Sequence, residues 1–357
     1  MAPRRTTRET VPPALARAQF APALLDVLRT LDEAGHRSWL VGGMVRDLLL
    51  GRRGTDVADL DVATPARPAD VSRLFPKVIP TGIEHGTVTV LSRGVPIEVT
   101  TFRGEGPYLD GRRPSSVSFL DDVDGDLARR DFTVNAIAYD PVERRIRDPF
   151  QGQRDLRRGV LRAVGDAAAR FAEDGLRPLR AVRFAAQLGF RVEPATARAI
   201  PPALPVVARV SAERVSQELA KLVVAPHARR ALALLDATGL AAVVLPELAA
   251  LGAADRRHAF DVTAAAPPEL PVRLAALFHA LARSQGAVAA AQRTREALRR
   301  LRFPGQVQDE ASRLVQEHGC LLARARPPLP RASADVRRWL ARVGPGRSAA
   351  LLALWTA

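Results

Sequence analysis

The 357-residue sequence is poor in cysteine, in lysine and in long apolar segments. Its single cysteine, Cys320, excludes an intramolecular disulfide and a cysteine-based zinc cluster, which fits a reducing cytoplasm. No uninterrupted apolar run approaches the ~20 residues that span a bilayer, so no membrane partner is expected. Only Lys77 and Lys221 are lysines, which makes 51 of the 53 basic residues arginines. The formal net charge of +15 favours a polyanionic partner, nucleic acid before membrane, although an arginine-rich genome would give the same excess.

The hydrophobic pattern changes near residue 150. Before that point, short apolar or alternating runs at 38–43, 59–64, 86–91 and 96–102 predict strands between helices at 21–35, 44–51 and 68–75. Residues 103–130 are polar and glycine-rich and read as a mobile loop. Beyond 150, Ala/Leu/Arg helical patterns dominate. The prediction is an α+β chain with a flexible arm at 1–21, a head with a small mixed sheet at 22–150, an all-helical remainder, and a linker at 322–332.

An acidic segment, DVADLDVATP at 56–65, interrupts the basic chain. Side chains two residues apart share a face of a strand, so Asp59 and Asp61 lie side by side, whereas Asp56 is expected to be peripheral. Two parallel carboxylates repel unless a cation lies between them, and Mg²⁺ prefers such oxygen ligands together with substrate phosphates. Glu98, on an adjoining predicted strand, is the well-placed candidate for a third acid. Asp-x-Asp is also a common surface pattern, so the pair gains weight only from its context.

That context is the segment LVGGMVRD, which ends a predicted strand with two glycines and opens a helix. The turn at Gly42 and Gly43 leaves backbone N–H groups bare for phosphate. Arg46 follows one turn into the helix, placed to reach a triphosphate. A Gly-Gly turn followed by Asp-x-Asp on the next strand predicts a cradle for a nucleoside triphosphate and Mg²⁺.

A second group of polar residues lies in EDGLRPLRAVRF, which carries, in order, Asp174, Arg177, Arg180 and Arg183. Pro178 is tolerated only in the first turn of a helix, so the helix is expected to begin near Gly175. This puts the aspartate at the helix start and the arginines along one face. A carboxylate accepts a hydrogen bond from the amino group of cytosine or adenine, and arginine donates to a ring acceptor. A solvated arginine stripe with a capping aspartate is the alternative interpretation.

Six segments together resemble a known family: LVGGMVRDLLLG, DLDVAT, HGTVTV, IEVTTFR, RRDFTVNA and EDGLRPLRAVRF. From about residue 38 to 225, in order and at matching spacing, they resemble bacterial class II tRNA nucleotidyltransferases, the CCA-adding enzymes of the polymerase-β-like superfamily, related to poly(A) polymerases. The segment TDVADLD departs slightly from the family pattern.

The resemblance implies addition of C, C and A to the 3′ end of tRNA from CTP and ATP, with release of pyrophosphate. It implies Mg²⁺ on Asp59 and Asp61, and Glu98 is kept as the candidate for a further catalytic acid because of its place on the adjoining predicted strand. It divides the chain into the head, a neck at 151–225 that recognises the base and RNA, and a helical body and tail at 226–357. The nucleotide contacts that it implies, together with those expected above, are Gly42, Gly43, Arg46, Arg130, Asp131, Asn135, Asp174, Arg177, Arg180 and Arg183.

Two further segments support this interpretation. Residues 152–230 hold 15 basic and 7 acidic residues, a surplus expected to follow tRNA phosphates. AERVSQELAKL, at 212–222, is expected to be a structural helix of the neck, with its charged residues paired within the helix. In CCA-adding relatives a flexible loop at the position of 103–118 helps switch specificity from C to A, which argues against a CC-only enzyme.

Rival hypotheses remain open. A bacterial poly(A) polymerase shares the head, but such enzymes typically carry Arg-Phe-Arg where this chain reads TGIEHGTVTV. An enzyme that adds only the final A, or an RNA-binding protein without catalysis, would use the same fold. The segments around His258 and His279 resemble an HD phosphohydrolase domain, but Ala280 stands where the acid is required, so a degenerate segment without phosphodiesterase activity is expected.

Overall fold

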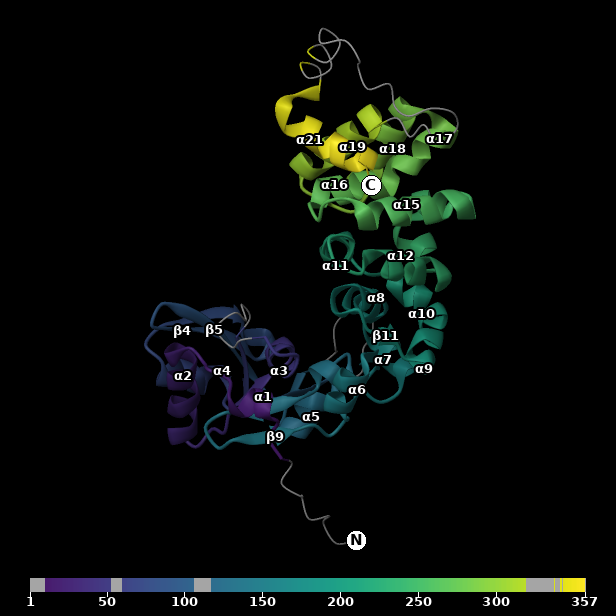
Figure 1. The fold of residues 1–357 in the computed structure, drawn as a ribbon. Helices are drawn as coiled ribbons and strands as arrows, with labels where there is room; N and C mark the ends of the chain where they lie inside the picture. The colour runs from purple at the N-terminus through teal and green to yellow at the C-terminus, as the bar shows by residue number, and fades with distance from the viewer. Residues whose placement is uncertain are drawn as a thin grey trace. The chain divides into compact units, whose positions relative to one another are not determined.

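The computed structural model describes residues 10–52, 60–105, 117–318, 337, 341 and 343–356. The chain forms two compact units, Met1–Glu173 and Asp174–Ala357 (Figure 1). The predicted linker at 322–332 lies outside the described residues.

The first unit combines a sheet with short helices. Its helices are α1 (Pro13–Ala16), α2 (Pro22–Glu33), α3 (Gly43–Leu49), α4 (Pro68–Leu74), η2 (Ile83–His85), α5 (Val123–Ala128), η3 (Thr133–Asn135), α6 (Gly152–Arg158) and α7 (Ala167–Glu173). Its strands are β1 (Trp39–Val41), β2 (Asp61–Thr64), β3 (Val78–Gly82), β4 (Thr87–Ser92), β5 (Val95–Thr101), β6 (Arg103–Glu105), β7 (Val117–Phe119), β8 (Ala138–Asp140), β9 (Arg145–Arg147) and β10 (Val160–Leu161).

Among the described residues, seven of these strands form one mixed sheet in the order β3-β4-β5-β2-β1-β8-β9. Strands β2 and β5 run parallel, and the other neighbours in this sheet run antiparallel. Strands β6 and β7 form a separate hairpin. The structure therefore confirms an α+β head with a small mixed sheet.

Two apolar layers fix this sheet. Trp39 and Val41 of β1 share a face with Val123 and Leu127 of α5, and all four side chains are buried. On the other face, the Tyr139 hydroxyl donates a hydrogen bond to the carbonyl of a residue in α1 at 3.3 Å. Because side chains alternate along a strand, each strand at the centre of the sheet contributes to both layers.

The predicted flexible arm is wrong for the described part of residues 1–21. Leu15 of α1 is 1% exposed, and α1 begins with Pro13 in its first turn, a position that suits proline. Burial of one leucine on the head is worth about 2 kcal/mol, which offsets part of the entropy lost when this short segment is ordered.

The predicted mobile loop at 103–130 is also wrong where the structure describes it. Strands β6 and β7 pair with Arg103 opposite Phe119, and α5 follows after Asp122, whose carboxylate accepts a hydrogen bond from the Gly125 N–H. Residues 106–116 lie outside the described residues. The glycines that suggested a loop instead allow close packing: a Cβ on Gly125 would lie 2.5 Å from Leu120.

The second unit is built of helices, as predicted, with one two-residue strand. Its elements are α8 (Leu176–Leu188), β11 (Arg191–Val192), α9 (Pro194–Arg198), α10 (Ile200–Val207), α11 (Ala212–Val223), α12 (Ala228–Ala237), α13 (Leu240–Val244), α14 (Pro246–Ala249), α15 (Ala253–Ala265), α16 (Leu270–Phe278), η4 (His279–Leu281), α17 (Ala282–Gln285), α18 (Ala287–Arg300), α19 (Gly305–His318) and α21 (Pro345–Thr356).

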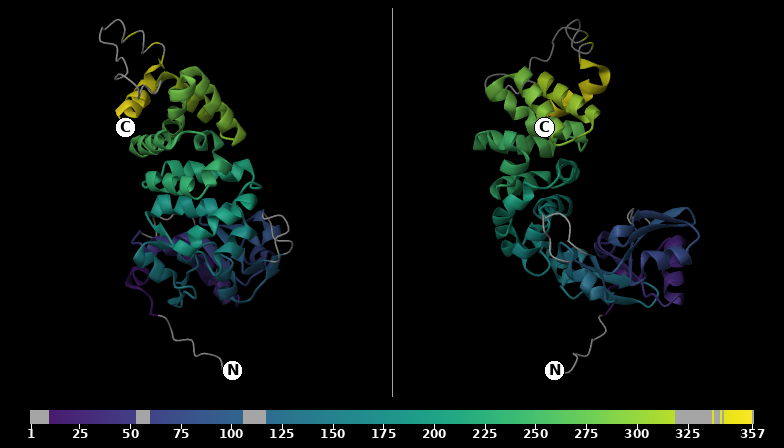
Figure 2. Two further views of the ribbon diagram at one scale, coloured as in Figure 1. Left: turned by 90° about the vertical axis from the view of Figure 1, so that its right-hand side faces the viewer. Right: turned by 180° about the vertical axis from the view of Figure 1, so that it is seen from behind.

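Within this unit the longer helices pack in successive layers. Helix α8 contacts α11 and α12, α12 contacts α15, α15 contacts α16, and α19 contacts α16, α18 and α21. Figure 2 shows this succession from two further directions. No helix among the described residues is both long and apolar enough to cross a bilayer.

Candidate active site

The Gly-Gly turn lies between β1 and α3 and is closely surrounded. Gly42 has φ +71° and ψ −133°, a conformation that only glycine adopts without strain. A Cβ at this position would lie 3.0 Å from Arg130 Nη1 and 3.6 Å from Asp61 Oδ2. The turn thus brings an arginine and an acid from two other segments to the same backbone.

Asp61 and Glu98 are direct neighbours on the parallel strands β2 and β5. Residues in register on adjacent strands point to the same face, so the two carboxylates share one face of the sheet. Glu98 is exposed and Asp61 is half-buried. Asp59 lies outside the described residues. Within the described part of the chain, no group of three or more His, Cys, Asp or Glu side chains is spaced to hold a metal ion.

Arg46 belongs to a chain of hydrogen bonds. Its Nη1 donates to Asn135 Oδ1 at 2.8 Å, and Asn135 Nδ2 donates to Asp131 Oδ1 at 3.0 Å. The same Asp131 oxygen accepts the backbone N–H of Phe132 at 2.8 Å. Asn135 and Asp131 are both buried, at 6% and 9% exposure, so they hold Arg46 rather than present themselves to solvent.

Arg130 is anchored by an acid that the sequence interpretation missed. Its Nη2 donates to Asp126 Oδ2 at 3.0 Å, and its Nε is buried with no hydrogen-bond partner among the described residues. Asp126 is completely buried. Burial alone would raise the pKa of the Asp126 carboxyl, but the Arg130 and Arg129 guanidiniums outweigh it and hold that pKa below its usual value. Asp126 is therefore a buried anion. Its place in an apparent loop gave no signal for this role.

In the second unit, Asp174 precedes α8, as predicted. Its Oδ1 accepts the Leu176 N–H at 2.9 Å, and its Oδ2 accepts from Arg214 Nη2 of α11 at 2.7 Å. Gly175 is the residue before the helix, and Pro178 lies in its first turn, in agreement with the prediction.

The arginines of α8 differ in their surroundings. Arg177 is 6% exposed. Arg183 Nε donates to Glu218 Oε2 at 2.7 Å, and the Arg183 guanidinium lies 3.5 Å from the centre of the Phe184 ring. Arg180 Nη1 lies 3.7 Å from Glu218 Oε1. Both arginines therefore pair with Glu218 of α11. Arg180 is the more exposed of the two, with 32% of its side chain accessible, whereas 8% of the Arg183 side chain is accessible.

These contacts correct the expectation for 212–222. Its charged residues were expected to pair within one helix. Instead, Glu218 pairs with Arg183 of α8, and Arg214 pairs with Asp174, which precedes α8. The helix is amphipathic and Glu218 falls on its buried side, with 5% exposure. A buried acid needs a cation from a neighbouring element, which local spacing does not reveal.

Three histidines meet in the helical unit. His279 Nε2 lies 2.8 Å from His258 Nε2, its Nδ1 lies 2.5 Å from the Ala276 carbonyl oxygen, and its ring lies 5.0 Å from that of His318. Burial lowers the pKa of His279 to about 3 and that of His318 to about 4, and neighbouring histidines add to both effects. The cluster is a neutral element of the helical core at ordinary pH.

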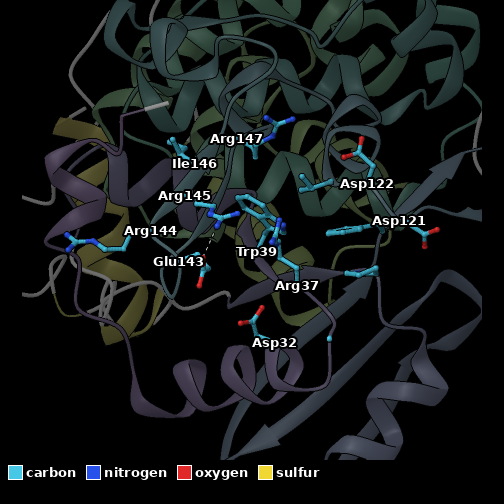
Figure 3. Close-up of a pocket in the computed structure, with 14 residues that line it drawn as sticks. Asp32, Arg37, Trp39, Asp121, Asp122, Glu143, Arg144, Arg145, Ile146 and Arg147 are labelled. Carbon is cyan, nitrogen blue, oxygen red and sulfur yellow. Dashed lines mark hydrogen bonds and ion pairs between the residues drawn. The ribbon is translucent and has the colours of Figure 1, made fainter. Parts of the chain in front are cut away.

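A cavity of about 1170 Å³ lies elsewhere in the first unit (Figure 3). It touches Trp39, the first residue of β1, Pro65 beyond the end of β2 and Phe102 beyond the end of β5. Asp61 begins β2 and Gly42 follows β1, so the cavity is at the opposite end of these strands. Two of its arginines are engaged with acids: Arg145 donates to Glu143, and Arg147 to Asp124. It is therefore separate from the candidate active site.

Comparisons with known proteins identify two family domains in the chain. Residues 38–162 match the poly A polymerase head domain, and residues 189–251 match the probable RNA and SrmB-binding site of polymerase A.

Individual relatives give a consistent result. The CCA-adding enzyme of Geobacillus stearothermophilus is 44% identical over 295 residues, which cover 82% of this chain and 69% of the relative. That of Geobacillus kaustophilus (strain HTA426) is 50% identical over 227 residues, 63% of this chain and 55% of the relative. The chain therefore spans little more than half of some relatives.

Solved structures agree with the sequence matches. The crystal structure of the Bacillus stearothermophilus CCA-adding enzyme in complex with CTP has a TM-score of 0.77 and 37% identity, and the match covers 94% of this chain and 78% of that one. The Thermotoga maritima CCA-adding enzyme complexed with tRNA has a TM-score of 0.68 at 21% identity, a similarity of fold, over 97% of this chain and 81% of that one. With its head domain, its RNA-binding segment and these relatives, the chain belongs to the CCA-adding enzymes of the tRNA nucleotidyltransferase and poly(A) polymerase family.

Proposed function

We propose that this chain adds C, C and A to the 3′ end of tRNA from CTP and ATP without a nucleic-acid template. The observation that carries the proposal is the 44% identity to a CCA-adding enzyme over 82% of the chain. The geometry around Gly42 supports it, because an acid and an arginine meet there beside the glycine turn. In the reaction, the terminal ribose 3′-hydroxyl attacks the α-phosphorus and pyrophosphate leaves.

Membership of this family implies use of a divalent metal ion. We propose Mg²⁺, held by Asp59 and Asp61 with Glu98 as a further acid. The paired register of Asp61 and Glu98 supplies hard carboxylate oxygens on one face, the donor type that Mg²⁺ prefers. The bound ion would neutralise phosphate charge and lower the pKa of the attacking hydroxyl.

The triphosphate is proposed to bind at the glycine turn. The lack of side chains at Gly42 and Gly43 lets phosphate approach the backbone, and Arg46 and Arg130 donate to its oxygens. Asn135 and Asp131 are proposed to act by holding Arg46 through the hydrogen bonds described above. This arrangement fixes the cations before the substrate arrives, which favours transition-state stabilisation over binding alone.

Base selection is proposed for Asp174 and Arg177, with Arg180 and Arg183 farther along α8. Each oxygen of Asp174 accepts one hydrogen bond and retains a second lone pair for a cytosine or adenine amino group. Uracil and guanine would present a carbonyl to the same oxygen and leave buried polar atoms unpaired. Arg183 is proposed to act by orienting α8, because its Nε is bound to Glu218 of α11.

The remaining assignments concern the RNA and the cell. We propose that residues 22–150 carry catalysis, that 151–225 recognise the base and RNA, and that 226–357 form a helical body and tail. The basic surplus of 152–230 supports contact with the acceptor phosphates. A cytoplasmic location is proposed because a chain with a single cysteine fits a reducing compartment.

The proposal is tested by incorporation of labelled CTP and ATP into tRNA that ends at the discriminator base, at ~0.1 M salt so that nonspecific attraction is screened. We expect two C and one A per tRNA, no incorporation of UTP or GTP, and no activity for Asp61→Ala. Product without C, or retained activity in that variant, would contradict the proposal.

A second candidate is poly(A) polymerase, since the matching head domain is named for that enzyme. ATP alone with a generic RNA separates the two, because long A-tails would favour this candidate. An enzyme that adds only the final A is distinguished with tRNA ending at the discriminator base, which it would leave unextended.

A further inference from the structure

The buried acid Asp126 occupies an unusual position in the head. It lies on α5 and is fully buried, so it is a charged group inside the head. Four N–H groups point at its carboxylate: Oδ1 accepts from Arg129 Nε at 2.9 Å, from Arg129 Nη2 at 2.7 Å and from the Arg103 backbone at 3.4 Å, and Oδ2 accepts from Arg130 Nη2 at 3.0 Å. Three of these donors share Oδ1 and one binds Oδ2, so both oxygens of the carboxylate are held.

Arg130 is the partner of Asp126 that reaches the candidate site. Its Nη2 is bound to Asp126, while its Nη1 faces the turn, 3.0 Å from the Cβ position of Gly42. Because Nη2 is held by Asp126 and Nη1 is packed beside the turn, rotation of the guanidinium would break the ion pair. Arg129 takes up the other oxygen and does not compete for the same acceptor.

We propose that Asp126 is a positioning residue that fixes the Arg130 guanidinium against the Gly42 turn, so that Arg130 is aimed at the triphosphate before the nucleotide binds. The inference rests on the proposed function, because it assumes that a nucleoside triphosphate occupies the turn. The Arg103 N–H ties the same carboxylate to the start of β6, so the first strand of the β6–β7 hairpin and Arg130 share one anchor.

The first test is Asp126→Asn, which keeps the shape of the side chain but removes its charge. Asp124→Asn is the matched control, because Asp124 lies on the same helix and pairs instead with Arg147, with 32% of its side chain exposed. We expect kcat/KM for both CTP and ATP to fall about 10- to 100-fold in D126N, with the KM for tRNA unchanged. D124N should stay within about twofold of the unmodified chain.

A double-mutant cycle separates positioning from general damage. If Asp126 acts through Arg130, D126N should lower kcat/KM less than about threefold in an R130A background, because residues that act as a unit are not additive. Full additivity of the two substitutions would overturn the proposal.

The charge-balanced variant D126N/R129Q covers the case in which D126N does not fold, because it removes one buried cation together with the anion. It should remain as impaired as D126N, and wild-type kcat/KM in this variant would overturn the proposal. A crystal structure of D126N or of D126N/R129Q gives a readout independent of activity: the Arg130 guanidinium should leave its place beside Gly42, and an unmoved guanidinium would overturn the inference. If the unmodified chain adds no nucleotide, the proposed function fails, and the crystallographic result still decides the role of Asp126.

Discussion

The histidine cluster predicts that the helical unit loses stability as the pH falls from 6.5 to about 3. His279 has its pKa lowered from 6.5 to about 3 and His318 from 6.5 to about 4, mainly because burial disfavours the charged ring. Above pH 6.5 neither state binds the proton. Below it, the unfolded chain takes up protons that the folded chain does not, so the free energy of unfolding falls as the pH falls.

The size of the effect follows from these values. At pH 5, the pH lies 1.5 units below the ordinary histidine pKa of 6.5, so the ring is protonated in the unfolded chain while the buried ring is still neutral. This difference lowers the free energy of unfolding by about 2 kcal/mol for each of the two residues. A loss of about 4 kcal/mol is a large part of the stability of an ordinary domain.

The assay is urea unfolding followed by circular dichroism at pH 8 and pH 5 for the unmodified chain and two variants. His318→Gln removes one buried titrating ring whose Nδ1 has no hydrogen-bond partner among the described residues. Between pH 8 and pH 5, the variant should lose about 2 kcal/mol less of its free energy of unfolding than the unmodified chain loses. His85→Gln, at an exposed position of the other unit, is the matched control and should show no such change. If the H318Q difference is the same at both pH values, the reasoning is refuted.

Three further predictions concern the site and its supports. Asp61→Asn should lower nucleotide incorporation at least about 100-fold, and chelation of divalent ions should abolish it in the unmodified chain until Mg²⁺ is restored; activity in a chelator would contradict the metal proposal. Gly42→Ala should raise the KM for CTP and ATP about tenfold, because the new Cβ meets Arg130. The control is Gly94→Ala, where φ is also positive but no atom beyond the adjacent residues lies within 4 Å of the new Cβ; it should lose only about 1 kcal/mol of stability through backbone strain, with KM unchanged. Equal KM values in the two variants would refute this prediction. Glu218→Gln should lower the free energy of unfolding by about 3 kcal/mol, because it removes the buried carboxylate that pairs with Arg183. Glu213→Gln, exposed on the same helix, should change it by less than about 0.5 kcal/mol, and denaturant titration compares the two.

The elements that the sequence predicted well are those with strong local patterns. The alternating residues of β4 and β5, the apolar spacing of α2 and the proline near the start of α8 each determine structure within a few residues. The meeting of Gly42 with Asp61 followed from the succession of strand, turn and strand, because neighbouring strands bring their ends together.

The residues that the sequence did not reveal depend on partners far along the chain. Glu218 resembles a surface acid of an amphipathic helix until Arg183 of α8 is placed against it. Asp126 lies in a polar, glycine-containing stretch, and the six-residue helix that buries it is too short to give a periodic signal. Leu15 follows two prolines and has no neighbouring apolar pattern, so only the sheet surface explains its burial.

The parallel pairing of β2 with β5 has a consequence for ion binding. Because α4, β3 and β4 lie between the two strands along the chain, Asp61 and Glu98 meet only through a long-range contact of the folded head. Any divalent ion that depends on both carboxylates can therefore bind only a head whose long-range contacts are complete. The affinity for the ion would then measure whether the tertiary structure of the head is complete. A chain that kept its helices but lost the β2–β5 contact would not bind the ion.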